Sequence, residues 1–154
     1  MAKELLFRLK FPNAVIDEVC HLIKEHMFFY ESTWSDAAVR RFLVRVGKEN
    51  IENLFLLRYA DLYGMHRTPV NARSENVRLL NELKDRIAAI EAEKSAQSLK
   101  DLAVNGHDLM ELGIPSGRQI GYILNELFQC VLDDPAMNTK EKLLTVAQRL
   151  KESV

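Results

Sequence analysis

Residues 102–121 read LAVNGHDLMELGIPSGRQIG. The glycines and the proline of this stretch predict a short helix over 107–112, a turn over 113–115, and a second helix that opens at Ser116. Gln119 follows Ser116 by three residues, which is the spacing of a capping box. Because a helix N-terminus presents unpaired N–H donors and the positive end of the helix dipole, this opening is a favourable place for a phosphate group.

Two helices complete the C-terminal segment. After Ser116, apolar residues recur every three or four positions, and Asp133-Asp134-Pro135 is expected to end that helix. A last helix is expected to be capped by Asn138, with Glu141 in the reciprocal position. The apolar faces comprise Ile120, Ile123, Leu124, Leu127, Phe128 and Val131 in the first of these helices, and Leu143, Leu144, Ala147 and Leu150 in the second.

Helical spacing also dominates the rest of the chain, and alternating strand-like patterns are not found, so the predicted fold class is all-α. A long polar helix is expected from about Ser74 to Gln97, and its narrow apolar stripe runs from Leu79 to Ile90. Before it we expect a short lead-in helix, a helix from Pro12 to about Phe29, one from Ser35 or Asp36 to Gly47, and one from about Glu49 to near Gly64.

The composition indicates one ordinary or two small globular domains. The chain has 154 residues, 47% of them hydrophobic, and 21 basic against 22 acidic residues give a formal net charge of −1. This balance argues against purely electrostatic attraction to nucleic acid or to an anionic membrane. Neither a signal peptide nor a membrane span is recognised, and Cys20 and Cys130 have no partner at metal-ligand spacing. We therefore expect a cytoplasmic protein with buried thiols and no membrane partner.

No catalytic motif is evident. The sequence has no nucleophile elbow, glycine-rich phosphate loop, Cys-x-x-Cys or His-Glu-x-x-His pattern, so no catalytic residue is assigned. Asp61 is the single candidate metal ligand, and an ion pair with Arg58, one turn earlier, is the favoured interpretation. The histidines do not cluster at ligand spacing, which favours packed or solvated side chains; they are His21, His26, His66 and His107.

The glycine-rich stretch supports two interpretations. In the structural one, Gly106 and Gly113 only end helices, Gly117 serves a first turn, and Gly121 allows close packing. In the binding one, the free amides of residues 116–118 face a phosphate group.

Long ordered motifs in this chain resemble the C-terminal part of bacterial tRNA nucleotidyltransferases, the CCA-adding and poly(A) polymerase family. The most specific are DLAVNGHDLMELGIPSGRQIG at 101–121, LNEL at 124–127 and VLDDPAMN at 131–138. Four earlier motifs resemble the later half of the HD-type helical domain of that family: LKFP at 9–12, HLIKEHM at 21–27, VRRFLVRVG at 39–47 and YADL at 59–62.

The resemblance implies a remnant of a helical bundle joined by a long helix to a small RNA-binding domain. It implies an HD-type-derived region over 1–68, a connecting helix over 69–97 and a tRNA-binding domain over 98–154. The early His and His-Asp pair of the HD motif would lie before Met1, leaving Asp61 as the match to its final aspartate. The catalytic head of the family, with its Mg²⁺ and ATP or CTP, has no counterpart in these motifs, so the chain alone is expected to hold no cofactor and to be inactive.

The resemblance also implies which residues contact RNA and which partners the chain has. Asp108 is expected to brace the turn near the binding residues. The predicted partners are tRNA or other RNA and the catalytic head, and a homodimer is an open alternative. Backbone contacts are assigned to Asn105, Gly106, Gly117 and Arg118, with Arg40, Arg41 and Arg45 added from the basic face of the helix over 35–47.

Two alternatives from other functional classes stay open. The first part of the chain could be an HD-type, metal-dependent phosphohydrolase-like domain. The chain could also be a structural docking or dimerisation module that uses the stripe from Leu79 to Ile90 as its interface.

Overall fold

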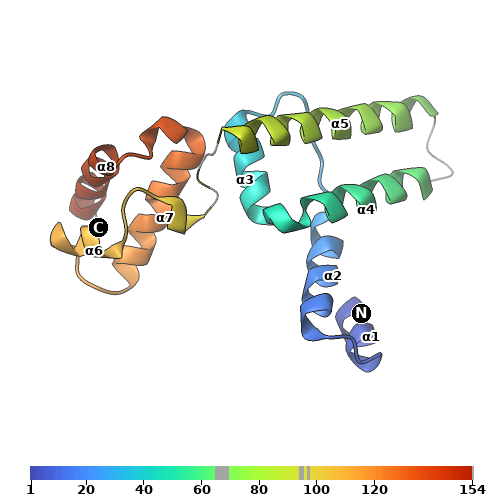
Figure 1. Cartoon of the computed structure of the whole chain (residues 1–154), viewed down its shortest axis with the longest axis horizontal. Coiled ribbons are helices and arrows are strands. Elements are labelled where there is room, and N and C mark those ends of the chain that lie inside the picture. Colours follow the sequence, from blue (N-terminus) through green and yellow to red (C-terminus); the bar gives the residue numbers. More distant parts are fainter. Residues whose placement is uncertain (65–69, 94–95, 97, 154) are drawn as a thin grey trace. The chain divides into compact units, whose positions relative to one another are not determined.

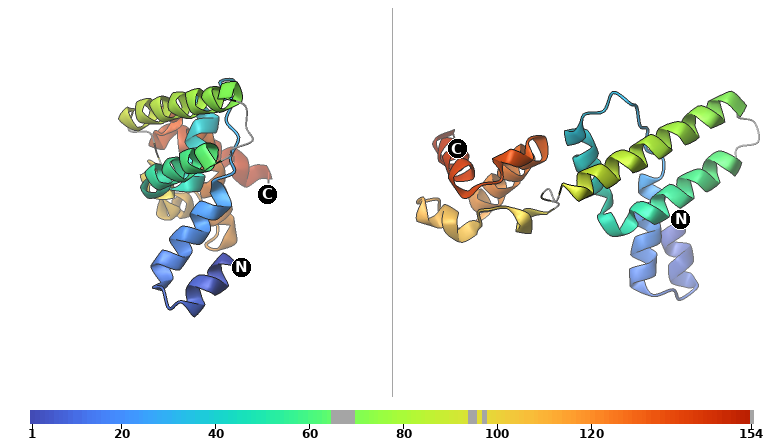
Figure 2. Two further views of the ribbon diagram at one scale, coloured as in Figure 1. Left: turned by 90° about the vertical axis from the view of Figure 1, so that its right-hand side faces the viewer. Right: turned by 45° about the horizontal axis from the view of Figure 1, so that its top comes forward.

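A computed structural model describes residues 1–64, 70–93, 96 and 98–153. In this part the chain forms eight α-helices, three short 3₁₀-helices and no β-strand, which confirms the predicted all-α class (Figures 1 and 2). The chain divides into two compact units, residues 1–34 with 42–88 and residues 35–41 with 89–154. The α-helices are α1 (Ala2–Arg8), α2 (Asn13–Glu25), α3 (Asp36–Val46), α4 (Ile51–Gly64), α5 (Val70–Ala92), α6 (Gly106–Glu111), α7 (Arg118–Asp133) and α8 (Lys140–Ser153).

The first unit contains a hairpin of α1 and α2, and α4 and α5 run antiparallel to each other (Figure 1). The helix α2 begins at Asn13, one residue after the predicted start, and Pro12 is its N-cap residue, whose carbonyl accepts the amide of Ile16 at 3.1 Å. The helix ends at Glu25, earlier than predicted, because the chain turns there and places Phe28 in the core. The main core residues of this unit are Ile16, Phe28, Tyr30, Phe42, Leu43, Val46, Leu54, Phe55, Leu62, Leu80, Leu83 and Ile87.

Both predicted ends of α3 are confirmed. The Ser35 hydroxyl accepts the amide of Ala38 at 3.2 Å, which satisfies a donor of the first turn. Gly47 follows the last residue of the helix with φ at +84°, a conformation that glycine adopts at little cost. The next helix is preceded by a 3₁₀ turn over Lys48–Asn50 and ends at Gly64, close to the predicted limits.

The long helix α5 begins at Val70, one turn before the predicted start, and ends at Ala92. Its apolar stripe is buried in the chain itself: the exposed fractions are 4% for Leu80, 0% for Leu83, 3% for Ile87 and 4% for Ile90. The prediction that this stripe forms an interaction surface is therefore wrong, because neighbouring helices of the same chain already cover it. None of the helices in the described ranges combines the length and apolar character that a bilayer-crossing segment requires.

In the second unit, α6, α7 and α8 surround a core of their own. The apolar faces predicted for α7 and α8 are confirmed, and Asp134 and Pro135 follow the end of α7 as expected. Asn138 does not cap α8: its Oδ1 accepts the amide of Ala103 at 2.8 Å, and its Nδ2 donates to the carbonyl of Asp101 at 2.9 Å. The core comprises Ala96, Leu102, Val104, Leu109, Ile114, Ile123, Leu127, Phe128, Val131, Leu132, Leu143 and Ala147.

Candidate nucleic-acid interface

A capping box opens the short helix α6. The Asn105 side chain accepts the amides of His107 at 2.8 Å and Asp108 at 3.3 Å, and the Asp108 carboxylate accepts the amide of Asn105 at 2.8 Å. The expected bracing role of Asp108 is confirmed. The sequence signal was Asn followed three residues later by Asp, a variant of the Ser/Thr and Glu/Gln pattern on which the prediction relied.

Asp108 also joins α6 to α8. Its Oδ1 lies 2.5 Å from Nζ of Lys140, and the carboxylate is buried. The hydrogen bond from Lys140, together with that from the Asn105 amide, lowers the pKa of Asp108, and the same contact raises the pKa of Lys140. Both groups are therefore charged at neutral pH, and the first turn of α6 is held in place.

Gly106 and Gly113 fit the α6–α7 turn in different ways. Gly106 begins α6 and does not end a helix as predicted; a Cβ there would lie 3.3 Å from Cγ2 of Ile120, so α6 and α7 approach closely at this point. Gly113 follows the end of α6 with φ at +77°, which confirms the predicted helix end. Nearby, Nζ of Lys151 donates to the carbonyl of Leu112 at 2.7 Å. These contacts fix the turn between the two helices.

The start of α7 is open. Gly117 is its N-cap residue, no side chain accepts a hydrogen bond from its first turn, and a Cβ built on Gly117 would meet no atom within 4 Å. The predicted capping box of Ser116 and Gln119 is therefore wrong: the helix begins two residues later, at Arg118. The N–H groups of its first turn have no acceptor within the helix, so the positive end of the dipole lacks a counter-charge from a cap.

Arg118 stands at this opening as an exposed side chain with no ion pair or hydrogen bond among the described residues. The binding interpretation of the sequence requires an arginine and unpaired amides at one helix start, and the structure brings these groups together. Gly121, one turn on, is exposed with no atom within 4 Å of a Cβ, so the predicted close packing there is wrong.

The basic face predicted for α3 is not free. Arg40 is only 8% exposed; it donates to the carbonyl of Leu132 at 3.2 Å and pairs with Glu93 at 3.4 Å, so its predicted place on the solvent side is wrong. Its Nε is buried without a partner among the described residues. Arg41 pairs with Asp133 at 2.6 Å, and Arg45 pairs with Glu25 at 3.0 Å. A role for these three side chains in RNA contact stays a prediction.

The candidate metal ligand Asp61 pairs with Arg58, with 2.9 Å between Oδ2 and Nη1, which confirms the favoured interpretation. In the described ranges, no three or more His, Cys, Asp or Glu side chains gather in a way that could hold a metal ion.

His21 bonds to the carbonyl of Val46, and His26 to that of Ile23. His66 lies outside the described residues. The thiols of Cys20 and Cys130 are free and half-buried.

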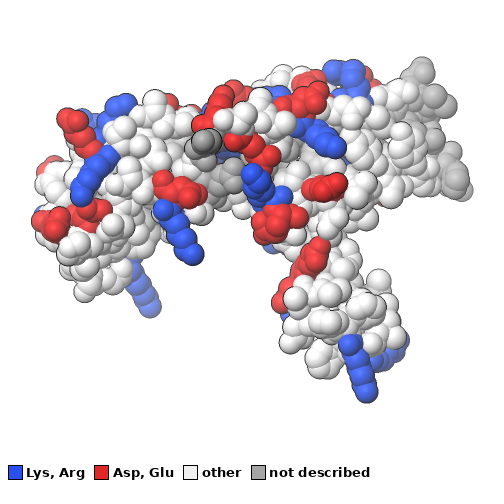
Figure 3. All heavy atoms as spheres, in the orientation of Figure 1, with Lys and Arg blue, Asp and Glu red and all other residues white. Residues whose placement is uncertain are grey.

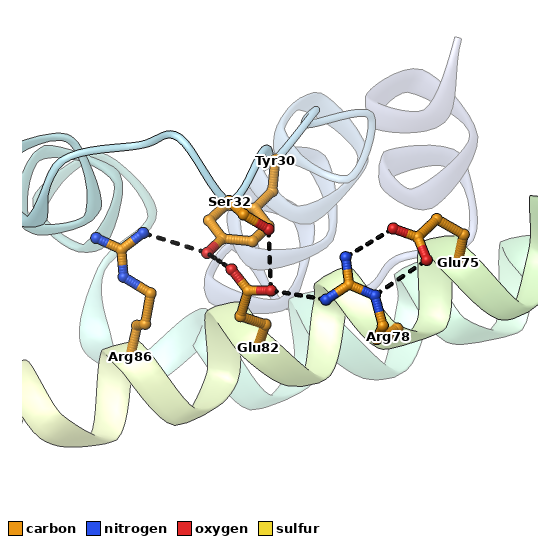
Figure 4. Close-up of polar contacts among 6 residues, drawn as sticks. All are labelled: Tyr30, Ser32, Glu75, Arg78, Glu82 and Arg86. Carbon is orange, nitrogen blue, oxygen red and sulfur yellow. Dashed lines mark hydrogen bonds and ion pairs between the residues drawn. The ribbon is translucent and has the colours of Figure 1, made fainter.

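A polar network in the first unit, which the sequence did not predict, ties the loop after α2 to α5 (Figure 4). Glu82 accepts hydrogen bonds from Ser32 at 2.9 Å and Tyr30 at 2.8 Å, and these bonds lower its pKa. Arg78 bridges Glu75 and Glu82, and Arg86 donates to the Tyr30 hydroxyl. The members are paired with one another, so we assign this network to the fold and not to a binding site.

Charges of both signs alternate over the face shown in Figure 3. At the start of α7 itself, Arg118 gives a ligand a local cationic contact. Backbone amides and one arginine are suited to an anion such as phosphate.

The fold and this site define an all-helical protein with a candidate anion-binding turn. A family model with the description "tRNA nucleotidyltransferase domain 2 putative" matches residues 1–147. The chain therefore belongs to the tRNA nucleotidyltransferase domain 2 family, which confirms the resemblance recognised in the sequence motifs. A comparison with curated proteins and with solved structures gives no match.

Proposed function

We propose that this chain binds tRNA and positions it for a tRNA nucleotidyltransferase or polynucleotide adenylyltransferase, an enzyme that extends RNA 3′ ends. The family match over residues 1–147 supports the relation to tRNA. The observation that carries the binding role is the start of α7, where Arg118 is exposed and the first-turn amides have no side-chain cap. Nucleotide addition, with Mg²⁺ and ATP or CTP, is assigned to a catalytic head that partners this chain.

The proposed contact uses shape and phosphate charge. The major groove of an A-form helix is too narrow for side chains to read its bases, so a protein that holds the body of a tRNA contacts riboses and phosphates. In the proposal, the amides at Gly117 and Arg118 face one phosphate, and the Arg118 guanidinium adds a charge-assisted contact. Asn105 and Gly106 shape the neighbouring turn and present their backbone to the same strand.

The proposal extends to the organisation of the chain. It assigns residues 1–68 to an HD-type-derived region, 69–97 to a connecting segment and 98–154 to the RNA-binding domain. The compactness of the second unit, which includes 98–153 and has a core of its own, supports an RNA-binding body that keeps its shape.

The direct test is tRNA binding by the intact chain with Arg118→Glu. Because the substitution replaces a cation that contacts a phosphate by an anion, it should weaken the affinity for tRNA by about tenfold at low salt. The slope of log Kd against the logarithm of the salt concentration should fall by about one, the value of one phosphate contact. The matched control is Arg8→Glu, another exposed arginine near a helix end, in α1. Equal losses for both variants, or no tRNA binding by the unmodified chain at low salt, would contradict the proposal.

A further inference from the structure

The first unit has an open pocket of about 300 Å³ where the end of α2, the following loop and α3 meet. We propose that this pocket binds the base and phosphate of one unpaired nucleotide. The inference rests on the proposed function, because it extends nucleic-acid recognition to a single nucleotide. Its lining residues are Lys24, Glu25, Met27, Phe28, Phe29, Trp34 and Arg45, and all belong to the first unit.

Aromatic side chains offer a planar surface in this pocket. Phe29 is 71% exposed, which leaves most of a large apolar ring in water. Trp34 is half-buried, and its ring meets the rings of Tyr30 and Phe42 edge-on, with centroids 5.4 and 6.0 Å away. The tryptophan is therefore held in place, while the phenylalanine is free to contact a ligand. Nucleobases stack on such rings whatever their identity.

The charged side chains provide the polar half of the recognition. Glu25 is only 9% exposed, and its carboxylate lies 3.0 Å from Nε of Arg45 and 3.9 Å from Nζ of Lys24. Arg45 also lies over the Phe42 ring, 5.5 Å from its centroid, so its guanidinium is positioned from two sides. Two cations against one carboxylate leave a net positive charge, which attracts a phosphate group.

Hydrogen-bonding groups of both kinds are present at the pocket. The side chains of Arg45 and Lys24 are 56% and 80% exposed, so their other N–H groups remain available as donors. The Glu25 carboxylate can accept from an exocyclic amino group of a base. A nucleotide combines a planar face, an edge of donors and acceptors, and an anionic group. A simple anion would make no use of Phe29, and a purely apolar ligand would make no use of the remaining N–H donors of Arg45 and Lys24.

The size of the pocket limits its occupant. A volume of about 300 Å³ is at the lower end of the range of small-ligand sites. The pocket is thus suited to one nucleotide and not to a duplex. This nucleotide is either free in solution or part of a single-stranded RNA segment, and the chemistry of recognition is the same for both.

The fluorescence of Trp34 gives a direct measurement, because it is the single tryptophan of the chain. The intact chain would be titrated with AMP, CMP, an oligoadenylate of six residues and ribose 5-phosphate. We expect the three probes that carry bases to change the emission of Trp34 and ribose 5-phosphate to leave it unchanged. Saturation by the oligonucleotide at a lower concentration than by AMP would identify an RNA segment as the occupant, and equal concentrations would identify a free nucleotide.

Matched variants test the aromatic and the cationic contacts. Phe29→Ala should raise the oligoadenylate Kd at least about fivefold, since stacking contributes at least about 1 kcal/mol per base. Phe7→Ala removes an equally exposed ring (73%) from α1, outside the pocket, and should change the Kd less than about twofold. Lys24→Ala should weaken binding of all three probes that carry a phosphate and a base, while Lys3→Ala should not. Unchanged Trp34 emission of the free variants shows that the fold is retained.

The outcomes separate this inference from the proposed function. An unchanged Trp34 signal with every base-carrying probe, or equal effects of Phe29→Ala and Phe7→Ala, would overturn the pocket even if tRNA binding depends on Arg118. A Trp34 response that survives Arg118→Glu would support the pocket by itself, and it would do so even if the chain bound no tRNA.

Discussion

Gly117 is the N-cap residue of α7 and Gly121 lies in its first turn; a Cβ at either would meet no atom within 4 Å, yet their backbones differ. Gly117 has φ +129° and ψ −148°, a region that residues with a side chain rarely adopt, whereas Gly121 lies within α7 without a positive φ. The backbone conformation therefore favours glycine at position 117, where the helix begins, and does not require glycine at position 121. The open start of α7 depends on this one residue.

We predict opposite effects of the same substitution at these two positions. Gly117→Ala should lower the free energy of unfolding by about 1–3 kcal/mol, because the added Cβ forces a strained backbone although no atom is near it. Gly121→Ala should raise it by about 0.5–1 kcal/mol, since alanine is the better helix former. Urea denaturation of the two variants measures both values. A loss of stability at Gly121, or no loss at Gly117, would show that the contacts and not the backbone determine the effect.

Residues with local partners could be predicted from the sequence. Ser35 and Gly47 bound a helix through neighbours in the chain, and Asp61 pairs with Arg58 three residues earlier. The burial and the hydrogen bond of Arg40 could not be predicted, because its acceptor, the carbonyl of Leu132, is 92 residues away in the chain. A helical periodicity describes one apolar face, and it cannot show that a second packing contact covers the opposite face of the same helix.

At the scale of elements, α6 has only six residues and is too short to be stable by itself. Its position is set by the Asn105 capping box, by the close approach of Gly106 to α7 and by the ion pair between Asp108 and Lys140 of α8. The sequence predicted the helix from its glycines, but the ion pair joins residues 32 positions apart. The contacts that orient the element were therefore not predictable from local patterns.

The Asp108 ion pair predicts a pH-dependent stability. The folded-state pKa of Asp108 lies below its ordinary value of about 3.9. The ionised carboxylate thus contributes stability that is present above about pH 4 and is lost as the pH falls through the lower, folded-state value. Asp108→Asn should lower the melting temperature at pH 7, and the difference from the unmodified chain should shrink as the pH falls below 4. Thermal denaturation at several pH values measures this difference.

The control for that series is Asp17→Asn, an exposed aspartate of α2. It should leave the melting temperature nearly unchanged at pH 7 and the pH profile parallel to that of the unmodified chain. A difference between Asp108→Asn and the unmodified chain that persists undiminished at low pH would mean that the amide disturbs the capping box and that the charge has no effect.

At the scale of the whole molecule, the fold class and most helices followed from apolar periodicity, and the family followed from the motifs at 101–138. The compact units could not be predicted in the same way. Their boundary falls after Ala88, inside α5, and residues 35–41 at the start of α3 belong to the second unit. Sequence signals mark loops and helix ends, but boundaries between the two units also lie within the helices α3 and α5, where the sequence has no such signal.

The distribution of charge over the molecule leads to a prediction about salt. The net charge is −1, and several arginines are paired with carboxylates, among them Arg40, Arg41, Arg45, Arg58 and Arg78. These paired arginines are therefore less available than free cations to replace the counterions of a nucleic acid. We expect a plot of log Kd for tRNA against the logarithm of the salt concentration to have a slope of about 3 or less, equivalent to about three phosphate contacts. Titrations between low and moderate salt measure this slope, and a value near 8 would mean that the paired arginines exchange their carboxylates for phosphates.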